Sequence, residues 1–176
     1  MTWTRFHRRG EVLREVVATA NTRRDGLLPT DVPGVTETFA DDLELLGALQ
    51  LKWHTRLAGQ VERALSEQPL DLPGAVATAW AATSDVLPGV RLVVDHYRAA
   101  PTSEAMAAAM ATATRKEHAY LAAMAGLAGI GDDEAAAPIG ARLEERARTL
   151  HRGAPVVPAD DVRPTWLDRL RAAFAA

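Results

Sequence analysis

The chain has 176 residues, a formal net charge of -3, 48% hydrophobic and 24% charged residues, and no cysteine. This length suits one domain with a sizeable core, and the balance of apolar and charged residues excludes global disorder. The slight negative charge argues against a surface adapted to nucleic acid, and the missing cysteines exclude disulfides, thiolate metal sites and cysteine nucleophiles.

Alanine supplies much of the apolar content, and aromatic residues make up only 5% of the chain. Alanine is the strongest helix former, so this composition predicts an all-α fold. No apolar run reaches the length of about 20 residues that spans a membrane, and the N-terminus lacks the apolar stretch of a signal peptide. We therefore expect a cytoplasmic protein without nucleic-acid or membrane partners. Arginine strongly outnumbers lysine, which is typical of GC-rich bacterial genomes.

The apolar periodicity predicts an antiparallel bundle of three long helices, with N-terminal and C-terminal helices added to it. A first helix is expected over residues 10–24 and the long helices over 38–68, 73–100 and 103–126. Pro88 falls inside the middle long helix and should kink it or divide it in two.

A shorter amphipathic helix is expected over residues 132–152, with Glu144 and Arg148 at the favourable four-residue spacing. Residues 153–163 have the composition of a linker. This pattern predicts a bundle domain over residues 1–152 and a separate amphipathic helix over residues 164–176.

Glu117 is the most informative residue, because it interrupts the apolar face of the helix expected over 103–126. It lies seven residues after Met110 and four before Leu121, so all three side chains share one helix face. A buried carboxylate without a partner costs several kcal/mol, and such a group neutralises, pairs or binds something. The position is the best candidate for chemistry in the chain.

His54 and His118 complete a candidate site with Glu117. With tight turns between the long helices and a rise of about 1.5 Å per residue, His54 and Glu117 fall at the same height in the bundle. Imidazole and carboxylate groups are ligands for zinc, iron or manganese, and bundle cores can hold such metals. One hypothesis is therefore an interior site for a divalent metal or a small polar ligand.

The alternative hypothesis is a structural ion pair that only fixes the register of the helices. In that case Glu117 would pair with His54, or with an arginine such as Arg56 or Arg115. Asp95, together with Arg91 and Arg98, is interpreted as a solvated surface pair.

In shape alone, such a bundle is similar to the ferritin-like carboxylate proteins. Their Glu-x-x-His motif occurs nowhere in this sequence, and Glu117 and His118 are adjacent, about 100° apart around the helix. The residues therefore support no membership of that family.

The expected C-terminal helix carries an apolar face that must be covered by its own bundle or by another chain. This candidate interaction surface consists of Trp166, Leu167, Leu170 and Phe174. No catalytic motif is found, which favours a non-enzymatic protein that acts through protein–protein contacts as a homodimer. The alternative function is the interior metal or small-ligand site described above.

Overall fold

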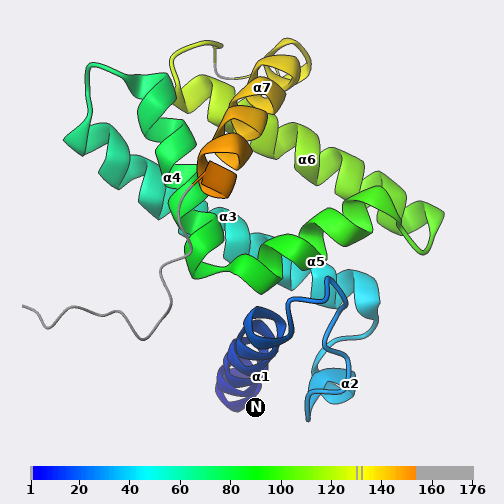
Figure 1. The fold of residues 1–176 in the computed structure, drawn as a ribbon. Helices are drawn as coiled ribbons and strands as arrows, with labels where there is room; N and C mark the ends of the chain where they lie inside the picture. Colours follow the sequence, from blue (N-terminus) through cyan, green and yellow to red (C-terminus); the bar gives the residue numbers. More distant parts are fainter. Residues whose placement is uncertain (1, 130, 132, 154–176) are drawn as a thin grey trace, which may run out of the picture.

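The computed structural model describes residues 2–129, 131 and 133–153, and the helices of this part of the chain form an all-α fold (Figure 1). The predicted fold class is confirmed. The helices are α1 (Thr2–Arg23), α2 (Val35–Thr38), α3 (Asp42–Glu67), α4 (Leu72–Val86), α5 (Pro88–Ala99), α6 (Glu104–Met124) and α7 (Asp133–Gly153). None of the helices in the described ranges is both long and apolar enough to cross a membrane.

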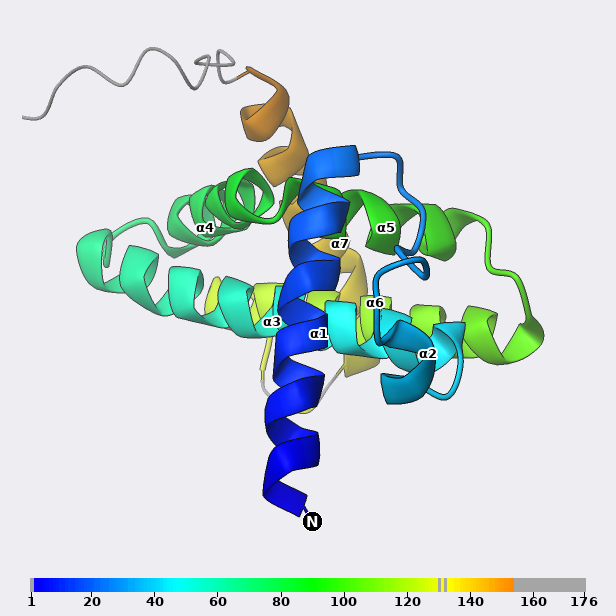
Figure 2. The ribbon, with the colours of Figure 1, turned by 90° about the horizontal axis from the view of Figure 1, so that it is seen from below.

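Helices α3 to α7 form the body of the molecule, with α4 and α5 on one side and α3 and α6 on the other (Figure 2). Helix α7 packs against both α4 and α6, and α3 packs mainly against α4. Helix α1 runs crosswise over this body and packs against α5. One continuous core includes the fully buried Trp53, Leu57, Trp80 and Leu121.

The first of the long helices, expected over 38–68, begins later than predicted, because the chain breaks between α2 and α3. The Asp41 side chain caps α3 by accepting a hydrogen bond from the Glu44 amide at 2.7 Å. The Glu44 carboxylate in turn accepts from the Ala40 amide and from Arg9 of α1, both at 2.7 Å. Helix α1 begins well before residue 10, and Arg9 fastens this early part to α3.

Pro88 divides the third predicted helix into α4 and α5. The break is stabilised from α1, because the side-chain oxygen of Asn21 accepts hydrogen bonds from the amides of Gly89 and Val90 at 3.0 and 3.4 Å. A Cβ on Gly89 would lie 1.8 Å from the carbonyl oxygen of Ala20, so only glycine permits this approach of the two helices. The division turns α5 so that its polar side faces α6 and α7.

Candidate functional site

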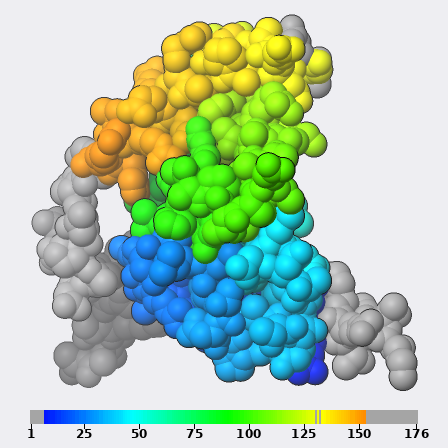
Figure 3. Space-filling view, turned by 90° about the vertical axis from the view of Figure 1, so that its right-hand side faces the viewer, coloured from blue at the N-terminus to red at the C-terminus, as the bar shows by residue number. Residues whose placement is uncertain are grey.

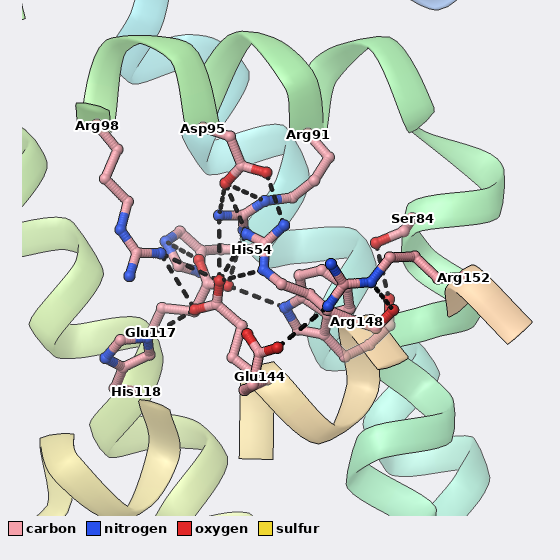
Figure 4. Close-up of polar contacts among 12 residues, drawn as sticks. His54, Ser84, Arg91, Asp95, Arg98, Glu117, His118, Glu144, Arg148 and Arg152 are labelled. Atoms are coloured by element: carbon pink, nitrogen blue, oxygen red, sulfur yellow. Dashed lines mark hydrogen bonds and ion pairs between the residues drawn. The ribbon is translucent and has the colours of Figure 1, made fainter. Parts of the chain in front are cut away.

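The Glu117 carboxylate lies in the middle of the helical body, with a side chain only 3% exposed (Figure 4). Its Oε1 accepts a hydrogen bond from Arg91 Nη1 at 3.0 Å and another from Trp80 Nε1 at 3.2 Å. Its Oε2 lies 4.0 Å from His54 Nε2. The sequence prediction that Glu117 is turned away from water and level with His54 is therefore confirmed.

His54 contributes little charge to this contact at neutral pH. Burial lowers the pKa of its imidazole; the Glu117 carboxylate acts in the opposite direction, and the Arg91 guanidinium lowers the pKa further. A neutral imidazole cannot balance the Glu117 charge. Arg91 therefore supplies the counter-charge.

The Arg91 guanidinium is enclosed by aromatic rings and carboxylates. It lies 4.8 Å from the centroid of the Trp53 ring and 5.4 Å from that of Trp80, two rings that meet edge to face. Burial alone would lower the pKa of Arg91, but the charges of Glu117 and Asp95 outweigh it, and the pKa is raised. Arg91 is a permanent buried cation.

A second buried carboxylate, Glu144 of α7, lies close to the first. Its Oε2 is 2.6 Å from His118 Nε2, its Oε1 is 2.6 Å from Arg148 Nη2, and both oxygens accept from Arg98 Nη1 at 3.1 Å. Burial acts to raise the pKa of Glu144, but the hydrogen bond from His118 and the charges of Arg91 and Arg98 hold it far below its ordinary value. Glu144 is therefore ionised at neutral pH.

Asp95 of α5 joins the two halves of the site. Arg91 Nη2 donates to its Oδ1 at 2.5 Å, and Arg148 donates to both of its oxygens at 2.7 and 2.9 Å. Burial would raise the pKa of Asp95, and these arginine contacts lower it overall. We call the whole set the buried charge network: Arg91, Asp95, Arg98, Glu117, His118, Glu144 and Arg148.

The buried charge network is electrically balanced. Three arginines face three carboxylates, so the permanent charges cancel within the cluster. Charges of this kind are tolerated in a core only when each one is paired and hydrogen-bonded. The arrangement joins α5, α6 and α7 through directional contacts and fixes their relative register.

Gly140 of α7 positions Glu144 for this role. A Cβ on Gly140 would lie 1.9 Å from the carbonyl oxygen of His118, so the backbones of α6 and α7 touch at this point. Glu144 follows one helical turn later on the same face of α7. The close crossing brings its carboxylate to the His118 ring.

The geometry gives the predicted metal site no support. Among the described residues, no group of three His, Asp or Glu side chains is arranged to hold a metal ion. His118 contacts Glu144 and does not join the pair formed by His54 and Glu117. A cation bound at Glu117 would also have to displace or repel Arg91, which lies 3.0 Å away.

One interpretation of a charged pair was wrong. Arg91 and Asp95 do not form a solvated surface pair, since the Arg91 side chain is 5% exposed and Asp95 only 28%. The predicted pairing of Glu117 with His54 or with an arginine occurs: His54 lies 4.0 Å away, and the arginine is Arg91 in place of Arg56 or Arg115. The predicted interaction surface at residues 166–174 lies outside the described residues.

Comparisons of the chain with models of protein families, with curated proteins and with solved structures found no match.

The two central tryptophans allow a matched test of the network. Trp80 donates to Glu117, whereas the buried Nε1 of Trp53 has no hydrogen-bond partner among the described residues. Trp80→Phe should therefore lower the free energy of unfolding by about 2 kcal/mol more than Trp53→Phe, because only the former removes a hydrogen bond to a buried charge. Urea denaturation of both variants measures the difference. Equal losses would show that the bond to Glu117 contributes nothing.

Proposed function

We propose that this protein is a non-enzymatic helical scaffold that acts by protein–protein contact, and that it forms a homodimer through the face between α3 and α6. The observation that carries the proposal is an open apolar groove of about 580 Å³ on this face. Helices α3 and α6 touch only sparingly, which leaves the groove between them. We call it the α3–α6 groove.

The α3–α6 groove combines a projecting apolar side chain with a row of small residues. Leu51 is 67% exposed although it is large and apolar. The small residues that line the groove come from both helices: Gly47 and Ala58 from α3, and Ala109 and Ala113 from α6. A surface that carries both a projection and the hollows to receive it is complementary to a second copy of itself about a two-fold axis.

Gln50 gives the groove a polar group that suits the same occupant. The residue is 7% exposed and lines the groove, and its Nε2 has no hydrogen-bond partner among the described residues. An amide carries both a donor and an acceptor, so two Gln50 side chains related by a two-fold axis can bond to each other once a side-chain rotation brings the buried Nε2 to the groove surface. A buried amide of this kind can also fix the register of a pair of helices.

Sedimentation velocity over a concentration series tests the homodimer. The wild-type protein is expected to dimerise, and Leu51→Arg is expected to weaken the dimer at least tenfold, because it puts a charge in the contact in place of an apolar side chain; a tenfold change corresponds to about 1.4 kcal/mol. Leu70→Arg is the matched control, since Leu70 is fully exposed outside the groove and its replacement should leave the dimer unchanged. A protein that sediments as a monomer at every concentration, or equal effects of the two variants, would contradict the proposal.

A further inference from the structure

A cavity of about 380 Å³ lies between the end of α5, the middle of α6 and the start of α7, on a different surface from the α3–α6 groove. These three helices adjoin on the face shown in Figure 3, in green, yellow-green and yellow to orange. The polar residues that line the cavity are Arg98, Thr114, Arg115 and His118, and the rest are alanines and a proline. No carboxylate is among its lining residues, although the chain as a whole has a net charge of -3. We call it the Arg98–Arg115 cavity.

His118 presents one ring nitrogen for a ligand. Its side chain is 8% exposed, and Nε2 lies 2.6 Å from Glu144 Oε2. Because the ionised Glu144 can only accept, the Nε2 hydrogen points at Glu144, and Nδ1 is the ring nitrogen left for a ligand. No residue in the described part of the chain makes a hydrogen bond to this Nδ1.

The two arginines keep unused donors. Arg98 bonds to Glu144 through Nη1 alone, which leaves its Nε and Nη2 without a partner among the residues described (Figure 4). Arg115 is exposed and makes no hydrogen bond or ion pair to any described side chain. Guanidinium groups with free donors are suited to bind carboxylate or phosphate oxygens in pairs.

The neighbouring cavity of about 510 Å³ provides an internal contrast. It shares Arg98 and His118, but Asp95, Glu144 and Glu145 also line it. These carboxylates cancel the positive charge on that side. Of these two adjoining cavities, the Arg98–Arg115 cavity is therefore the one that favours an anion.

We propose that the Arg98–Arg115 cavity binds a small hydroxylated organic anion. The oxyanion group, a carboxylate or a phosphate, binds Arg98 and Arg115, and a ligand hydroxyl forms a hydrogen bond with His118 Nδ1. The alanines beside them accept a short hydrocarbon part. The volume limits the ligand to a small molecule, since cavities of about 300–1,000 Å³ hold compact ligands.

Titration of the full chain with glycolate, acetate and inorganic phosphate, followed by nuclear magnetic resonance of the His118 ring nitrogens, tests this site. Glycolate should give a saturable shift of Nδ1, and acetate, which lacks the hydroxyl, should bind at least fivefold more weakly. Saturable binding of phosphate in place of glycolate would assign the oxyanion as a phosphate.

Arg115→Gln should weaken binding of the preferred probe about tenfold, which corresponds to about 1.4 kcal/mol. Arg56→Gln, at an exposed arginine of α3 away from the cavity, is the matched control and should bind as the wild type does. Because Arg115 is exposed, its replacement leaves the core intact. The absence of a saturable shift with all three probes, or unchanged binding by Arg115→Gln, would overturn the proposal.

Discussion

Glu117→Gln is expected to lower the free energy of unfolding by about 3 kcal/mol, because it removes one charge from a buried and balanced cluster. The substitution keeps the shape of the side chain but leaves Arg91, which is 5% exposed, without its principal counter-charge. Asp95 compensates only in part, since Arg148 also binds it. Urea or thermal denaturation of the purified variant measures the loss.

Glu67→Gln serves as the matched control for this experiment. Glu67 is exposed at the end of α3 and has no ion pair or side-chain hydrogen bond within the described residues. A surface substitution of this kind changes stability by less than about 0.5 kcal/mol. If Glu117→Gln behaved like this control, Glu117 could not be a buried charge paired with Arg91.

Gly140→Ala is expected to be similarly damaging for a different reason. The added Cβ would lie 1.9 Å from the His118 carbonyl oxygen and 2.4 Å from the carbon of the same carbonyl, so α6 and α7 must move apart. Both atoms belong to the backbone and cannot rotate away. Overpacking of this kind costs about 3 kcal/mol, and here it would also pull Glu144 away from His118.

Gly59→Ala, the same replacement of glycine by alanine at another site, is expected to stabilise the protein. Gly59 is an exposed helical residue of α3, and a Cβ there would meet nothing within 4 Å. Alanine should therefore raise the free energy of unfolding by about 0.5–1 kcal/mol, because it restricts the unfolded chain. Denaturation curves of the two variants check that the free energy of unfolding falls for Gly140→Ala and rises for Gly59→Ala. A neutral Gly140→Ala would mean that α6 and α7 do not cross as closely as described.

The sequence was sufficient for the all-α fold and for one half of the site. A three- and four-residue periodicity identifies a helix and its buried face, so Glu117 could be recognised as a carboxylate on an apolar face. Regular helix rise then placed His54 at the same height, and the structure puts these side chains 4.0 Å apart. The first inference depends on local geometry alone, and the second also depends on the assumed tight turns between antiparallel helices.

The partners of Glu117 could not be found in this way. Arg91 with Asp95, and Glu144 with Arg148, have the four-residue spacing that is typical of pairs on solvent-exposed helix surfaces. In this protein, each of the two pairs with that spacing has one member that is buried, Arg91 in the first and Glu144 in the second. Only the tertiary arrangement distinguishes the two cases, and it depends on the break at Pro88, which turns α5, and on the close approach at Gly140.

Glu144 had one local signal that could have indicated burial. It follows Gly140 by four residues and is adjacent to Leu143, in a helix where Ala136, Leu143 and Ala147 are buried. A charged residue in line with a helical glycine indicates a face on which another helix approaches closely. His118 next to Glu117 could then have been assigned to a second carboxylate.

A double-mutant cycle on Arg91 and Glu117 tests most directly whether a paired buried charge holds the helices together. The free energy of unfolding is measured for the wild type, Arg91→Met, Glu117→Gln and the double variant. A coupling of about 2 kcal/mol is expected, with the double variant losing clearly less than the sum of the two single losses. Losses that add to within about 0.5 kcal/mol would show that the two groups do not interact, and would contradict a core held together by this ion pair.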